Sequence, residues 1–269
     1  MTAVDYEAEY NNRARVPEHP PIMAGWTKDA AEYRAKRPPR VLRYGPGERH
    51  RIDLFPGGDG PIVVFIHGGY WQALDGSSFS HCARGLNAHG IAVAVPTYDL
   101  CPAVTVADII TQMRMASREL ARLGHPLVVS GHSAGGHLAA CMLATDWPAF
   151  DPSLPENLIS AAYAISGLFD LPPLVRTSIN KALQLDDASA KAASPLFSAP
   201  PARGSLDAVV GGNESAEYFR QSRTIVEAWG RGIATRFGTV ADANHFTAIA
   251  PLADPDSPMV LRLKELARG

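Results

Sequence analysis

The segment GHSAG at residues 131–135 places Ser133 between two glycines, in the pattern G-x-S-x-G. The apolar run Leu127–Ser130 leads into it and the small-residue stretch Ala134–Thr145 follows, which predicts a buried strand, a tight turn and a helix. On such a turn a serine hydroxyl projects above the edge of a sheet, and the helix N-terminus faces the negative charge that develops on an attacked carbonyl. We therefore expect Ser133 to be a nucleophile; the alternative is a glycine-rich turn without chemistry.

A second glycine-rich segment, HGGYW at residues 67–71, follows the predicted strand Ile62–Ile66. Glycines at such a turn let backbone N–H groups point at a substrate carbonyl. The expected oxyanion-hole donors are the N–H groups of Gly68, Gly69 and Ala134. His67 is expected to be structural. Tyr70 and Trp71 are either core aromatics or walls of a substrate pocket, and both are candidate substrate-binding residues.

A general base for Ser133 is expected near the end of the chain, because in folds that display such a serine the base follows the last strand. Only two histidines lie C-terminal to Ser133. His137 falls within the helix that follows the serine and is expected to be a packing residue. His245 follows the last predicted strand, Ile233–Phe237, and precedes the final helix, Pro258–Ala267. His245 is therefore the predicted base.

The acid that orients the base is expected after the preceding strand, Leu206–Val210. The sequence there is GGNES, and Glu214 is its only carboxylate. Glu214 would hold the His245 ring in the required tautomer and stabilise its protonated form. Asp242, three residues before His245, is the alternative acid. Glu217 is expected on the surface of the helix that follows.

The elements that must position these residues alternate between strand and helix along the chain. The remaining predicted strands are Val41–Tyr44, Arg51–Phe55, Ile91–Val95 and Ala161–Ser166. The remaining predicted helices are Ser77–His89, Val104–Leu123 and Ala216–Trp229. This alternation predicts an α/β fold with a mostly parallel central sheet and helices on both faces. Residues 1–36 are expected to form a helical N-terminal extension, and residues 168–203 a short lid excursion, within a single domain spanning residues 1–269.

The composition excludes several classes of function. A formal net charge of −2 and scattered Lys and Arg residues give no field for nucleic acid or an anionic membrane. The N-terminus lacks the pattern of a secretory signal, and no apolar run is long enough to span a membrane. Cys82, Cys101 and Cys141 are widely spaced, which predicts buried thiols in a reducing cytoplasm. Neither a metal-ligand motif nor a phosphate-binding loop occurs, so no metal and no cofactor are expected.

Longer segments resemble kynurenine formamidases (arylformamidases) of the serine-hydrolase type, within the α/β-hydrolase superfamily. The resemblance covers most of the chain and is carried by HGGYWQ at 67–72, GHSAGGHLAA at 131–140, SGLFDLPPLVRTSINKALQLD at 166–186, SPLFSAP at 194–200, VVGGNESAEYFRQS at 209–222 and NHF at 244–246. It implies the α/β-hydrolase fold, with Ser133 as nucleophile, His245 as base and Glu214 as acid. The family more often has Asp at the acid position, so the chain departs from it there.

The resemblance implies hydrolysis of N-formyl-L-kynurenine to kynurenine and formate, a step of tryptophan breakdown. The partner would be a small-molecule substrate, and a homodimer is compatible with the sequence. Tyr70, Trp71 and Phe169 could stack on the aryl group, and Arg176 or Asn180 could meet a polar tail. Because bulky Tyr70 and Trp71 follow the two glycines, we expect a narrow acyl site. The alternatives are a general carboxylesterase for short-chain esters and a non-enzymatic small-molecule binder on the same scaffold.

Overall fold

The computed structural model describes residues 4–268 and contains an eight-stranded sheet in the order β1-β2-β4-β3-β5-β6-β7-β8. The strands are β1 (Arg40–Arg43), β2 (Arg51–Phe55), β3 (Ile62–Ile66), β4 (Ala92–Thr97), β5 (Leu127–His132), β6 (Ile159–Ile165), β7 (Ser205–Gly211) and β8 (Ala234–Val240). β2 pairs antiparallel with β1 and β4, and the strands from β4 across to β8 are parallel. The predicted mostly parallel sheet is therefore confirmed.

Eleven α-helices occur among residues 4–268, and several are very short. They are α1 (Tyr6–Tyr10), α2 (Asn12–Arg15), α3 (His19–Lys36), α4 (Arg84–Ala88), α5 (Val106–Ala121), α6 (Ala134–Leu143), α7 (Trp147–Phe150), α8 (Asn180–Leu183), α9 (Asp187–Ala192), α10 (Ala216–Trp229) and α11 (Pro258–Arg268). Four 3₁₀ segments join them: η1 (Gly76–Ala83), η2 (Pro172–Arg176), η3 (Pro195–Phe197) and η4 (Ala250–Ala253).

The predicted helix Ser77–His89 differs from the structure, where η1 winds as a 3₁₀ helix and only its continuation, α4, is α-helical. η1 is buried along most of its length against α3 and β4. Packing on several sides, rather than helix propensity, therefore sets its path.

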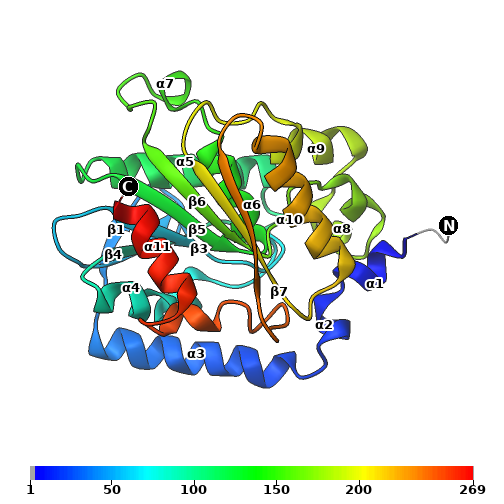
Figure 1. Ribbon diagram of the computed structural model, residues 1–269, viewed down its shortest axis with the longest axis horizontal. Helices are drawn as coiled ribbons and strands as arrows, with labels where there is room; N and C mark the ends of the chain where they lie inside the picture. The colour runs from blue at the N-terminus through cyan, green and yellow to red at the C-terminus, as the bar shows by residue number, and fades with distance from the viewer. Residues whose placement is uncertain (1–3, 269) are drawn as a thin grey trace.

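Alternating residues of β3 point to opposite faces of the sheet, and each face has its own core. Ile62, Val64 and Ile66 belong to the core under α5, α6 and α10, whereas Val63 and Phe65 belong to the core under α3, α4 and α11. All five are buried, as expected for a strand covered on both faces. Figure 1 shows α3, α4 and α11 together on one side of the sheet.

The N-terminal segment of residues 5–16, called here the strap, crosses to the end of the sheet where β5 and β7 terminate. α1 contacts η2 and α10, which come from distant parts of the sequence. Figure 1 shows α1 and α2, in blue, next to α8 and α10. The strap and the segment that contains η2 and α8 therefore meet near the carboxyl ends of the strands.

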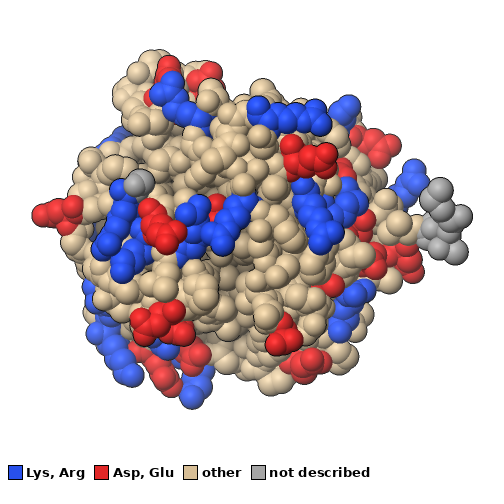
Figure 2. Space-filling view, viewed as in Figure 1, with Lys and Arg blue, Asp and Glu red and all other residues tan. Residues whose placement is uncertain are grey.

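The distribution of surface charge and the burial of the three cysteines match what the composition predicts. Acidic and basic side chains are interspersed on the face seen in Figure 2. The three cysteines are free and buried. None of the helices in residues 4–268 combines the length and apolar character that a membrane crossing requires.

Candidate active site

Ser133 occupies a strained turn between β5 and α6. Its φ of 56° and ψ of −118° are unusual for a residue other than glycine. The turn closes tightly, because a Cβ atom on Gly135 would lie 1.9 Å from the carbonyl oxygen of Ile66. Only glycine fits there, which explains the second glycine of the motif. Ser133 immediately precedes α6, whose first N–H groups have no partners within the helix.

His245 and Glu214 form a buried pair beside this turn. Nδ1 of His245 lies 2.6 Å from Oε2 of Glu214. The other carboxylate oxygen, Oε1, accepts hydrogen bonds from the Ser166 hydroxyl and from the Gly211 N–H. The Glu214 side chain is only 1% exposed. Because Nδ1 is engaged, Nε2 is the ring nitrogen of His245 left for exchange of a proton in the cavity.

Asp242, the alternative acid, is exposed and makes no ion pair with His245 in residues 4–268. Its backbone carbonyl accepts a hydrogen bond from the Asn213 amide at 3.0 Å. The structure therefore brings Glu214, and not Asp242, to the imidazole.

His132 anchors the backbone of His245. Its Nε2 lies 2.9 Å from the His245 carbonyl oxygen, which can only accept, so Nε2 carries the proton. Burial lowers the pKa of His132 well below its usual value, and the neighbouring His245 lowers it further. A neutral His132 thus donates to the loop that carries His245. Sequence reasoning missed this role, although His132 lies inside the serine motif.

The loop after β3 lies directly against the serine turn. A Cβ atom on Gly68 would lie 2.9 Å from the His132 carbonyl oxygen and 3.1 Å from Cβ of Ser133. Gly69 has a φ of +108°, which favours glycine. The structure therefore brings Gly68 and Gly69 next to Ser133, and Ala134 follows Ser133 as the first residue of α6.

His67 is buried and stacked between aromatic rings, as expected for a structural residue. Its ring lies parallel to that of Tyr98, with centroids 4.3 Å apart, and its Nδ1 donates to the Gly68 carbonyl oxygen at 2.7 Å. Burial lowers its pKa to about 4. His67 therefore supports the loop without carrying charge at neutral pH.

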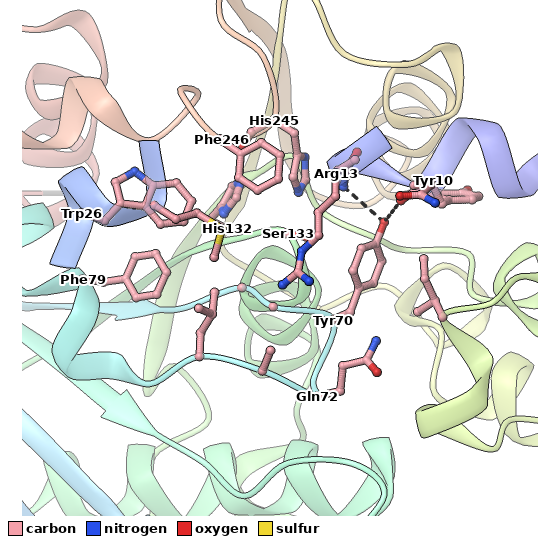
Figure 3. A pocket seen from close by; sticks show the side chains of 18 of the residues that line it. Tyr10, Arg13, Trp26, Tyr70, Gln72, Phe79, His132, Ser133, His245 and Phe246 are labelled. Carbon is pink, nitrogen blue, oxygen red and sulfur yellow. Dashed lines mark hydrogen bonds between the residues drawn. The ribbon is translucent and has the colours of Figure 1, made fainter. Parts of the chain in front are cut away.

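Ser133 and His245 open into a cavity of about 460 Å³. Five aromatic side chains line it: Tyr10, Trp26, Tyr70, Phe79 and Phe246. In Figure 3, Trp26, Phe79 and Phe246 form one wall, Tyr10 and Tyr70 stand on the opposite side, and Arg13 extends between them. The cavity is therefore shaped for a flat, largely apolar group next to the serine.

A cluster of hydroxyl groups joins the strap to the site. The Tyr218 hydroxyl lies 2.7 Å from that of Tyr70 and accepts a hydrogen bond from Asn12 Nδ2 at 2.8 Å. The Tyr70 hydroxyl donates to the Tyr10 carbonyl oxygen at 2.7 Å. The ring of Tyr218 packs against His245, with centroids 4.6 Å apart. Sequence reasoning missed Tyr218, although it lies only four residues after Glu214.

Two of the three aromatic residues expected to bind substrate lie elsewhere. Trp71 and Phe169 are fully buried in the core under α5, α6 and α10 and do not line the cavity. Trp71 packs edge-on against His137, and the backbone N–H of Phe169 donates to Gln221. Both rings are therefore part of this core, and neither is available to a substrate in the cavity. Tyr70 does line the cavity.

The lid residues expected to meet a polar tail also lie away from the cavity. Arg176 is exposed and does not line it. The side chain of Asn180 is used locally, bonding the backbone of Val175 and Leu185.

The expectation that Glu217 is a surface residue is wrong. Glu217 is buried and accepts a hydrogen bond from the Tyr10 hydroxyl at 2.7 Å. It also forms an ion pair with Arg220. The helical pattern of α10 could not reveal this, because the partner Tyr10 comes from the strap.

His137 is fully buried, and its Nε2 donates to the Ala193 carbonyl oxygen at 2.7 Å. Its expected packing role agrees with this position. No group of three His, Cys, Asp or Glu side chains suited to a metal ion occurs within residues 4–268.

Comparison with known proteins identifies the family. The family model described as "Alpha/beta hydrolase family" matches residues 63–266. Kynurenine formamidase from Salmo salar is 31% identical over 227 residues, which are 79% of this chain and 76% of that protein. The enzyme of that name from Danio rerio is also 31% identical, over 78% of this chain and 75% of its own.

A crystal structure from Silicibacter sp. TM1040, of a protein provisionally assigned as a thioesterase, superposes with a TM-score of 0.84. It is 36% identical and covers 99% of this chain and 100% of its own. The parallel sheet, the serine turn and these relatives agree with one another. The chain belongs to the α/β-hydrolase family, and within it to the hydrolases that resemble kynurenine formamidase.

Proposed function

We propose that this protein hydrolyses a small acyl amide with an aromatic leaving group, with N-formylkynurenine as the preferred substrate and an acyl-enzyme on Ser133. The observation that carries the proposal is the Glu214–His245 pair beside Ser133, at the end of an aromatic cavity. The similarity to kynurenine formamidases supports the choice of substrate.

In the first half of the proposed reaction, Nε2 of His245 takes the proton of Ser133 as its hydroxyl oxygen attacks the formyl carbon. Glu214 keeps the other ring proton on Nδ1 and stabilises the imidazolium. The N–H groups of Gly68, Gly69 and Ala134 are the proposed donors to the oxyanion. His245 then returns the proton to the amine nitrogen, the C–N bond breaks, and the aromatic amine leaves.

In the second half, water attacks the formyl ester on Ser133 while His245 accepts a proton from it. Collapse of the intermediate releases formate and restores the serine hydroxyl. In balance, one formamide and one water give one aromatic amine, one formate and one proton.

The cavity supports an aromatic leaving group. Its walls carry rings from α1, α3, η1 and the loops after β3 and β8, which suit an aryl ketone better than a flexible chain. Tyr70 is held by hydrogen bonds to Tyr218 and to the Tyr10 backbone, so its ring cannot easily move aside for a long acyl group. Because Trp71 is buried in the core, the expected narrowing of the acyl site rests on Tyr70 alone.

The test measures kcat/KM for N-formylkynurenine beside a series of p-nitrophenyl esters with formyl, acetyl, butyryl and octanoyl groups. We expect efficient release of formate from the formamide. Along the esters, we expect a fall of roughly 10- to 200-fold wherever the longer chain no longer fits. A flat or rising ester profile with no formamide hydrolysis would require the assignment to be withdrawn.

A short-chain esterase is the second candidate. It is favoured by the similarity to the Silicibacter structure, which is provisionally assigned as a thioesterase. An ester or thioester needs the same nucleophile and base but has a better leaving group. Turnover of acetyl esters or thioesters at least 100-fold above that of N-formylkynurenine would favour this candidate.

A further inference from the structure

One formally charged side chain lines the cavity. Among the residues described, the lining set contains Arg13 but neither Lys, Asp nor Glu. We propose that Arg13 binds a carboxylate of the substrate and thereby selects anionic aryl formamides over neutral ones. This inference rests on the proposed function for the identity of the substrate, and it adds the group that the site recognises.

Arg13 is free to bind an anion. Within residues 4–268 its guanidinium forms neither a salt bridge nor a hydrogen bond. By contrast, Arg15 on the same short helix lies 3.8 Å from Glu9 and donates to the Ala8 carbonyl oxygen. Figure 3 shows the Arg13 side chain extending from the strap into the cavity, between Ser133 and Tyr70. A guanidinium offers two parallel N–H donors, which match the geometry of a carboxylate.

The strap is held by hydrogen bonds of the residues that precede Arg13. The neighbouring Asn12 donates to Tyr218, and the Tyr10 hydroxyl donates to Glu217. Further back, both carboxylate oxygens of Glu7 accept hydrogen bonds from Ser178. The backbone that carries the guanidinium is thus fixed before substrate arrives, which lowers the entropy cost of binding.

The cavity offers a charged partner to the carboxylate of an amino-acid substrate but not to its ammonium group. No Asp or Glu lines it, so an ammonium group would find only neutral acceptors there, such as Gln72 and Asn11. The carboxylate, and not the amine, is therefore the group that contributes to discrimination. Removing the amine from the substrate should change kcat/KM much less than removing the carboxylate.

The test compares N-formylkynurenine with its decarboxylated counterpart, N-formylkynuramine, which keeps the aryl formamide and the amine. The measured quantity is the ratio of the two kcat/KM values. Arg13 is exposed before substrate binds, so solvent screens part of the interaction, and a bidentate pair with the carboxylate should give a ratio of about 5 to 30 in the wild-type enzyme. In Arg13→Met the ratio should fall close to 1, and in Arg13→Lys it should be intermediate.

Arg15→Met is the matched control, because Arg15 lies on the same helix but does not line the cavity. Its ratio should equal that of the wild type. Raising the salt concentration should lower the ratio in the wild type and not in Arg13→Met. A wild-type ratio near 1, or a ratio that is unaltered in Arg13→Met, would overturn the inference.

Failure of the proposed function can be told apart from failure of this inference. If the enzyme releases formate from neither compound, the proposed function fails. The inference is then decided with kynurenine and kynuramine as competitive inhibitors of p-nitrophenyl acetate hydrolysis. Stronger inhibition by kynurenine that disappears in Arg13→Met supports Arg13 as the carboxylate site, and equal inhibition by the two compounds refutes it.

Discussion

At the residue scale, Ser133 combines backbone strain with a position at the start of a helix. Its positive φ costs free energy that packing elsewhere must offset. Such strain is common at functional sites because it displays a side chain that a relaxed turn would hide. Because the surrounding packing imposes this backbone conformation, replacing Ser133 should remove the hydroxyl without changing the fold.

Replacing Ser133 with Ala should lower kcat by at least about 10⁴-fold, because it removes the proposed nucleophile while the cavity remains. The circular dichroism spectrum and the unfolding midpoint should change little. A phosphonylating reagent followed by peptide mass spectrometry should label Ser133 in the wild type. Near-normal turnover by a folded Ser133→Ala protein would sink the covalent mechanism.

Glu214 is the second residue whose surroundings point to a role. Both carboxylate oxygens are engaged, one by His245 and the other by Ser166 and Gly211. Replacing Glu214 with Gln removes the anion that orients the imidazole and should lower kcat by about 10³- to 10⁴-fold.

The matched control for Glu214→Gln is Asp242→Asn, which alters an exposed carboxylate three residues from His245. It should change kcat by less than about threefold, because Asn keeps the size of Asp and tolerates the positive φ of 56° at this position. If Asp242→Asn lost far more activity than Glu214→Gln, we would assign the acid to Asp242 instead.

At the scale of elements, the strap is attached to the sheet through α10. The Tyr10 hydroxyl donates to Glu217 and accepts from Gln221 Nε2 at 2.8 Å. Glu9 accepts from the backbone N–H of Glu217 at 3.0 Å. α10 also carries Tyr218, which packs against His245. The same helix therefore contacts both the strap and the candidate active site.

Tyr10→Phe should reduce the free energy of unfolding by about 1–3 kcal/mol, because it leaves the buried Glu217 and Gln221 with one partner fewer. The loss should be measured by urea denaturation. Tyr6→Phe is the control, since Tyr6 stacks on Tyr10 but its hydroxyl makes no hydrogen bond with residues 4–268. Equal losses in the two variants would show that the hydrogen bonds of the Tyr10 hydroxyl do not stabilise the strap.

At the scale of the whole molecule, several histidines are buried without a carboxylate partner. Burial lowers the pKa of His67 and of His137 to about 4. In the unfolded chain both regain an ordinary pKa near 6.5. Between these values the unfolded state binds more protons than the folded state, so stability is complete above about pH 7 and is lost as the pH falls toward 4.

The two histidines together should remove on the order of 2 kcal/mol between pH 6 and pH 5. Urea denaturation at a series of pH values measures this slope. His137→Phe should make the slope shallower, whatever it does to stability at pH 7. Phe55→Leu, which disturbs a buried ring that packs on Tyr33 and not on either histidine, should leave the slope as it is. An identical slope in His137→Phe would show that His137 is not the source.

The sequence by itself determined the features that depend on local pattern and chain order. The run Leu127–Ser130 before a G-x-S-x-G segment predicts a strand and a tight turn from nearest neighbours alone, and β5 and α6 follow it closely. The place of His245 near Ser133 could be predicted, because only one histidine follows the last predicted strand. Local patterns of this kind need no knowledge of what packs against them.

The tertiary structure alone decided which side chains surround Ser133. Trp71 and Trp26 are both large aromatics, yet Trp71 turns into the core and Trp26 faces the cavity, because the space beside each ring is set by distant segments. Arg13 reaches the site only because the strap folds back onto α10. Side-chain direction and long-range contact carry no periodic signature, so no pattern within the chain could have placed these residues there.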